Sequence, residues 1–187
     1  MTGPNRVRRT AFICIHCIAN LACFCAGCDT GSIARKEYFY GRAHNNCLDA
    51  VVILWCKIFA DKKAKHYSVN VVTDGERFKN ELLANLKMSE IEFFEYEKLM
   101  RGVRDKFIAH LDDLAAVPVP KFEPALESVK LLLDYLFRHE NKDNILEGVP
   151  RFPDPVYRLA YEDAHFAYTG KPKVIYTGGR NPAEDEQ

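Results

Sequence analysis

The sequence predicts an all-α fold, and three observations support that prediction. Apolar residues recur at steps of three and four in several segments, which is typical of helices with one buried face. No stretch of useful length in the first 140 residues alternates apolar and polar residues with a period of two, as a half-buried strand would. Prolines stand at the boundaries between the periodic segments. We therefore expect a bundle of four or five helices with a C-terminal appendage.

Length and composition indicate one ordinary folded domain. The chain has 187 residues, of which 48% are hydrophobic and 28% charged, with 26 basic against 26 acidic side chains. A chain of this size buries roughly 70% of its unfolded surface, so folding requires no metal or disulfide. Zero net charge excludes nucleic-acid binding through an overall basic body and also a strongly acidic disordered segment. Any contact with nucleic acid must come from a local basic patch.

Residues 1–32 form an apolar, cysteine-rich segment. Five of the seven cysteines lie here, and the pairs Cys14-x2-Cys17 and Cys25-x2-Cys28 have the spacing of a zinc or iron–sulfur site. The seven residues between the pairs contain no Gly or Pro to turn the backbone into a metal loop. We therefore predict a continuous helix in which the cysteines serve as small apolar core residues, with no bound metal and no cofactor.

The same segment also has features of a secretion signal. A basic start with Arg6, Arg8 and Arg9 precedes an apolar run over residues 11–24, and Cys25-Ala26-Gly27-Cys28 is similar to a lipoprotein cleavage box. Two polar residues interrupt the run, and the box has Cys where Leu is usual. We predict a cytoplasmic protein, and the alternative is an exported lipoprotein anchored at Cys28.

A helical bundle is predicted over residues 33–140. Its first helix runs from Ile33 to Ala60, with an apolar stripe and a lysine-rich end that suits the helix dipole. A short helix follows the Asp74-Gly75 break, and Ser89 with Glu92 forms a capping box that begins the next helix. The apolar residues of that helix are spaced alternately by three and four as far as Leu114; they are Phe93, Tyr96, Met100, Val103, Phe107, His110 and Leu114.

Prolines separate the last elements. Pro118 and Pro120 stop the preceding helix, and Pro124 suits the first turn of a helix that continues to Phe137. Residues 141–187 form a Pro-rich extension with a short helix from Val156 to Tyr168 and a polar end.

The candidate site lies on the helix that begins at Ser89. His110 occupies its apolar seam, and Arg104 lies in the flanking row, roughly 9 Å away along the helix axis. Arg101 stands four residues before Asp105, within reach of that carboxylate. A histidine on an apolar seam is commonly a packed core residue, and basic residues late in a helix suit its dipole. Spacing alone therefore leaves both a structural and a catalytic interpretation open.

The string from Arg104 to Asp112, Arg-Asp-Lys-Phe-Ile-Ala-His-Leu-Asp, resembles the signature of HEPN domains. Their shared motif is an Arg, a short gap and a His, and here the gap is five residues. The wider sequence is similar to the abortive-infection AbiU-type branch of that superfamily at residues 54–59, at residues 72–74 and at Phe78. The resemblance covers about residues 33–140 and implies a HEPN-like helical bundle.

The resemblance implies a metal-independent endoribonuclease of toxin or antiphage type. Such enzymes act as homodimers in which two copies of the motif face each other. His110 would move the proton of the ribose 2′-hydroxyl or of the leaving oxygen, Arg104 would hold the scissile phosphate, and Asp105 would orient Arg104 or His110. The expected products carry a 2′,3′-cyclic phosphate.

RNA-binding residues and partners follow from the same resemblance. A local basic patch would contact RNA through Lys98, Arg101 and Lys106. The expected partners are RNA, a second copy of the chain and a possible cognate antitoxin. The alternative is a non-catalytic HEPN-type module that binds RNA, a nucleotide or a protein.

Overall fold

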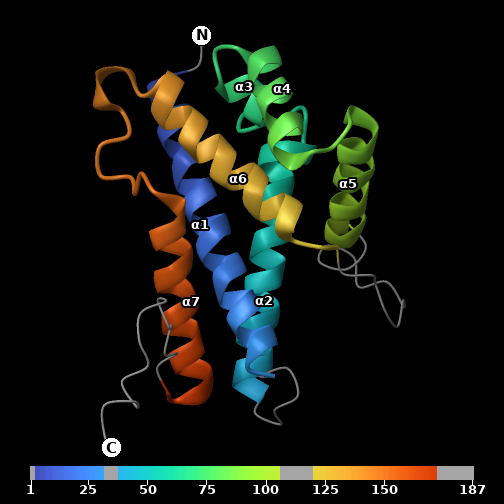
Figure 1. Cartoon of the computed structure of the whole chain (residues 1–187), viewed down its shortest axis with the longest axis vertical. Helices are drawn as coiled ribbons and strands as arrows, with labels where there is room; N and C mark the ends of the chain where they lie inside the picture. The colour runs from blue at the N-terminus through green and yellow to red at the C-terminus, as the bar shows by residue number, and fades with distance from the viewer. Residues whose placement is uncertain (1–2, 32–37, 106–119, 172–187) are drawn as a thin grey trace, which may run out of the picture.

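The all-α class is confirmed by the computed structural model, which describes residues 3–31, 38–105 and 120–171. These ranges contain seven α-helices and no strand (Figure 1). The helices are α1 (Pro4–Asp29), α2 (Tyr38–Trp55), α3 (Ser68–Val71), α4 (Gly75–Leu86), α5 (Glu90–Val103), α6 (Glu123–Tyr135) and α7 (Pro153–Thr169). Two π-helical turns, η2 (Cys56–Ala60) and η4 (Leu136–Glu140), extend α2 and α6, and a 3₁₀ turn, η5 (Lys142–Asn144), follows.

Helix α1 occupies the centre of the molecule. It lies between α2 and α7, and α6 crosses over it (Figure 1). Its buried side chains recur at steps of four and three, so one stripe runs the length of the helix: Val7, Ala11, Cys14, Ile18 and Leu21. These side chains belong to the same apolar core as α2 and α6. The N-terminal helix therefore packs as part of the bundle that the sequence predicted over residues 33–140.

The interpretation of the N-terminal cysteines as core residues is confirmed for Cys14 and Cys17. Cys14, Cys17 and Cys56 are buried, and burial raises the pKa of Cys17 to about 12. Cys28, in contrast, is exposed at the end of α1. In the part of the chain that the structure describes, no group of three or more His, Cys, Asp or Glu side chains is arranged to hold a metal ion.

Helix α1 is also long and apolar enough to cross a membrane. Its most apolar 18-residue window has a mean hydropathy of 2.0, and 44% of that window is buried against the rest of the protein. Core helices and N-terminal signals share these properties. The cytoplasmic location and the exported alternative therefore both stay predictions.

Several predicted helix boundaries are confirmed. Ser89 Oγ accepts the backbone N–H of Glu92 and the Glu92 carboxylate accepts the backbone N–H of Ser89, which is the expected capping box. Pro124 lies in the first turn of α6. The helix predicted to reach Leu114 is α-helical to Val103 and keeps helical backbone at Arg104; the rest of that prediction lies outside the described residues.

The core centres on Trp55 at the end of α2. Its side chain is fully buried, and its Nε1–H donates to Ser128 Oγ on α6 at 2.9 Å. The Trp55 ring packs edge-on against Tyr96 of α5, with 5.3 Å between centroids. The Tyr96 hydroxyl donates to the carbonyl of Lys121 at 2.7 Å. These contacts fix α5 beside the end of α2 and so position the candidate site.

The C-terminal extension contains the predicted helix, α7, and packs on α1. Tyr161 and Tyr168 of α7 form a small apolar cluster with Ala22 and Ala26 of α1. The Tyr161 hydroxyl also donates to the carboxylate of Asp29 at the end of α1. The extension thus covers a face of α1 that the bundle leaves open.

Candidate functional site

Arg104 joins the end of α5 to the end of α2. Its Nε–H donates to Asp105 Oδ1 at 2.8 Å, and its Nη1 donates to Asp61 Oδ1 at 2.6 Å. Asp61 follows η2 directly and closes it through a backbone hydrogen bond to Cys56, N to O 2.8 Å. The sequence placed Arg101 within reach of Asp105, and the resemblance implied that Asp105 orients Arg104 or His110; in the structure Asp105 pairs with Arg104. The partner that the sequence missed is Asp61, which is 43 residues away.

The two carboxylates hold Arg104 in its charged form. The hydrogen bond to Asp105, and then that to Asp61, raise the pKa of Arg104, while partial burial acts in the opposite direction. The Arg104 side chain is 24% exposed. Among the described residues, Nη2 has no hydrogen-bond partner. A guanidinium that is fixed on two sides and has donors left over suits the binding of a phosphate oxygen.

Of the other predicted RNA-binding residues, the structure describes Lys98 and Arg101. Lys98 pairs with Glu95 at 2.7 Å, and its Nζ lies 4.7 Å from the centre of the Phe94 ring. Arg101 shares a helix face with Arg104, because three residues make nearly one turn. Lys106 and His110 lie outside the described residues. The structure thus places Arg101 beside Arg104 and pairs Lys98 with Glu95.

Glu97 is a site residue that the sequence did not reveal. It is 4% exposed, and its Oε2 accepts no hydrogen bond among the described residues. The nearest cation is Lys62, with Nζ 4.0 Å from Oε2. Burial raises the pKa of Glu97, and the neighbouring cations only partly offset that effect. In the sequence, Glu97 is one of several acidic residues in the first half of the helix, where the helix dipole favours them. Nothing in the sequence therefore distinguished Glu97 as a buried residue.

Basic side chains from distant segments of the chain lie near the loop from Asp61 to Tyr67. We call this group the cationic cluster, and it contains Arg6, Arg9, Lys57, Lys63 and Lys65. Arg6, Lys63 and Lys65 line a cavity of about 830 Å³ between the start of α1 and the end of α6. Burial lowers the pKa of the nearby His66, and four cations, Lys57, Arg9, Arg6 and Lys65, lower it further.

The sequence identified the lysines of this cluster only as a solvated helix end. It could not join them to Arg6 and Arg9, because these come from α1, about fifty residues earlier. His66 connects the two segments, with Nδ1 lying 3.1 Å from Thr10 Oγ1. The folded chain therefore carries a local concentration of positive charge despite its zero net charge.

Comparisons with family models, with curated proteins and with solved structures find no match for this chain. The HEPN assignment thus stays a resemblance carried by the residues from Arg104 to Asp112.

Proposed function

We propose that this protein is a metal-independent endoribonuclease of toxin or antiphage type that acts as a homodimer. The observation that carries the proposal is the fixed Arg104 guanidinium, which is held by Asp105 and Asp61 and keeps Nη2 unpaired among the described residues. Arg104 also begins the Arg-x5-His string that ends at His110.

The chemistry assigns one role to each residue. His110 takes the proton from the ribose 2′-hydroxyl, whose oxygen attacks the adjacent phosphorus, and a proton returned to the leaving 5′-oxygen completes the cleavage. Arg104 offsets the negative charge that builds on the phosphate in the transition state. Asp105 holds Arg104 in position. The products are a 2′,3′-cyclic phosphate and a 5′-hydroxyl.

The charges on the surface support an RNA substrate. Arg101 lies beside Arg104 on α5, and the loop that supplies Asp61 continues into Lys63 and Lys65 of the cationic cluster. A polyanion is attracted to such a region even when the whole protein is neutral. We expect binding to weaken steeply as salt concentration rises.

A non-catalytic binding module is the second candidate, and one observation favours it. Two carboxylates already neutralise Arg104, so a phosphate must compete with both for the guanidinium. In that case the protein would bind RNA and leave it intact. A cleavage assay separates the two functions.

The test is incubation of the purified protein with single-stranded RNA in EDTA. The wild type should cleave the RNA to products that carry a 2′,3′-cyclic phosphate. His110→Ala should be slower by at least about a hundredfold, as for the loss of a general acid or base. His16→Ala is the matched control, because His16 is exposed on α1 and should leave the rate unchanged. Intact RNA after incubation with the wild type, together with RNA binding, would favour the binding module.

Three further expectations belong to the same proposal. Gel filtration should show a dimer, and expression should arrest growth unless a cognate antitoxin is present. The measured mass of a cytoplasmic protein should include the whole N-terminus. The mass of an exported and cleaved lipoprotein should instead correspond to a chain that starts at Cys28.

A further inference from the structure

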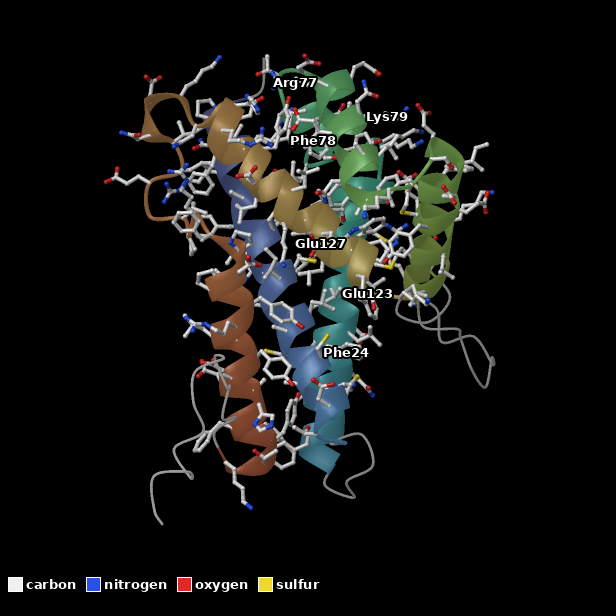
Figure 2. All side chains as sticks on the ribbon, in the orientation of Figure 1. Phe24, Arg77, Phe78, Lys79, Glu123 and Glu127 are labelled. Atoms are coloured by element: carbon white, nitrogen blue, oxygen red, sulfur yellow. The ribbon has the colours of Figure 1, made fainter. Side chains whose placement is uncertain are left out.

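A pocket of about 450 Å³ opens between η2, α3, α4 and α5. Its wall is largely aromatic and aliphatic, and includes Phe59, Tyr67, Phe78, Leu82, Phe93 and Phe94. Figure 2 shows Lys79 of α4 on the side of that helix that faces α5, and its Nζ pairs with Glu90 Oε2 at 2.8 Å. The volume and the apolar wall are those of a small-molecule site.

One polar group in this pocket is unsatisfied. Glu97 lines it with a buried side chain, and its Oε2 accepts no hydrogen bond from the described residues. A buried polar atom without a hydrogen-bond partner destabilises a fold, so such atoms call for an explanation. The described residues contain one other such atom, His44 Nδ1, but His44 lies against Phe24, with ring centroids 4.5 Å apart, and does not line this pocket. Glu97 thus combines an unmet acceptor with space for a ligand.

The surrounding charges restrict what the ligand can be. Lys62, Lys79 and Arg101 all act on Glu97 as cations. Glu76 and Glu90 also line the pocket, and Glu90 offsets the charge of Lys79. Lys62, with Nζ 4.0 Å from Glu97 Oε2, would repel an ammonium group at that oxygen. A neutral ring that offers adjacent N–H donors avoids this repulsion and still satisfies both carboxylate oxygens. Among common biological rings, the Watson–Crick edge of guanine has this pattern, and aromatic walls suit a flat base.

Lys62 controls access to the carboxylate. Its Nζ lies 4.0 Å from Glu97 Oε2 and 5.5 Å from the centre of the Phe94 ring. The Lys62 side chain is 58% exposed, so it can turn outward when a base enters. In that position its ammonium group would meet the phosphate attached to the base.

We propose that this pocket binds a guanine base, with the Glu97 carboxylate accepting hydrogen bonds from N1–H and the N2 amino group. Glu97 and Arg104 lie seven residues apart on one face of the α5 segment, which is roughly 10 Å along the helix axis. A guanine in the pocket would therefore sit beside the phosphate held by Arg104. This link to RNA rests on the proposed ribonuclease function, whereas binding of a free guanine nucleotide does not.

The pocket is tested by titrating the full chain with GMP and measuring binding by ligand-observed NMR. We expect GMP to bind about tenfold or more tightly than AMP, and Glu97→Gln to remove that preference, because a carboxamide offers a donor where guanine also has one. The matched control is Glu95→Gln on the same helix, since Glu95 is exposed and pairs with Lys98. Circular dichroism verifies that both variants fold. Equal binding of AMP and GMP, unchanged GMP binding by Glu97→Gln, or tighter binding of butylammonium than of GMP would overturn the proposal.

A second measurement distinguishes the RNA source from the free nucleotide. With the wild type, RNA cleavage should cluster next to guanines, and Glu97→Gln should spread the cuts over all bases. Selective GMP binding by a protein that does not cleave RNA would leave the pocket standing and reject the ribonuclease. RNA cleavage without any preference for guanine, together with unselective nucleotide binding, would reject the pocket and leave the ribonuclease standing.

Discussion

The Trp55 core and the Arg104 edge lie next to each other and satisfy their polar groups in different ways. By the Trp55 core we mean Trp55 with the side chains around it, and by the Arg104 edge we mean Arg104 with Asp61, Asp105 and Glu97. In the core, Trp55 donates to Ser128, which donates in turn to the carbonyl of Ala125 at 2.9 Å. At the edge, one Glu97 oxygen accepts no hydrogen bond from the described residues.

The difference indicates what each region is for. A buried hydrogen-bonded network fixes one packing arrangement, and the chain supplies every partner itself. A buried carboxylate with an unmet oxygen lowers stability, so a fold tolerates it where a ligand completes it. We therefore expect substitutions in the core to change stability and substitutions at the edge to change binding or cleavage.

The largest expected effect tests the core. Trp55→Ala removes a fully buried indole and should lower the free energy of unfolding by about 3–5 kcal/mol. Urea denaturation followed by circular dichroism measures the change. Phe152→Ala is the control, because Phe152 is 66% exposed and its loss should change stability by less than about 0.5 kcal/mol. Similar losses in the two variants would show that Trp55 is not central.

A smaller effect isolates the polar network of the core. Ser128→Ala leaves the buried Trp55 Nε1–H without its acceptor and should cost about 1–3 kcal/mol. The same denaturation experiment applies. A cost near zero would mean that a water replaces the hydroxyl, and the two regions would then not differ in the way described.

A local cap should matter less. Ser89→Ala removes the side-chain acceptor at the start of α5 and should cost about 1 kcal/mol. The cap also lowers the pKa of Glu92, through hydrogen bonds from Ser89. A lowered carboxyl pKa stabilises the fold above the usual Glu pKa, and that stabilisation is lost as pH falls through the lowered value. The cost of Ser89→Ala should therefore shrink in strong acid.

The smallest stability change should come from the edge, with the opposite sign. Glu97→Gln should leave stability equal or raise it at neutral pH, because it removes a buried charge that lacks a full set of partners. Burial raises the Glu97 pKa, so the wild type loses stability as pH rises from the usual Glu pKa through the raised one. The advantage of the variant should vanish in acid. A clear loss of stability at neutral pH would show that Glu97 is a structural ion pair with Lys62.

Local features of the fold were predictable from the sequence. The capping box at Ser89, Pro124 in the first turn of α6 and the three-and-four spacing of the buried apolar residues of α5 all act within a few neighbours, and the structure contains them. The helix from Val156 to Tyr168 was predicted for the same reason and lies within α7. The apolar stripe predicted for the helix from Ile33 to Ala60 was wrong at its start, because Phe39 is 74% exposed.

Features that depend on distant segments were not predictable. Arg104 pairs with Asp61, which is 43 residues away, and the cationic cluster joins α1 to the loop after η2. The central place of α1 depends on its contacts with α7 at the far end of the chain. A single sequence gives no signal for such pairings, since periodicity reports only on neighbouring turns.

The most direct test of the proposed function compares two arginines that have similar surroundings. Arg138 also bridges two carboxylates, Glu81 at 3.1 Å and Asp134 at 2.6 Å, and its side chain is 38% exposed. The measurement is the rate of RNA cleavage in EDTA by Arg104→Ala and by Arg138→Ala. We expect Arg104→Ala to be slower than the wild type by at least about a hundredfold and Arg138→Ala to match the wild type. Equal rates for the two variants would contradict the assignment of Arg104 to the active site.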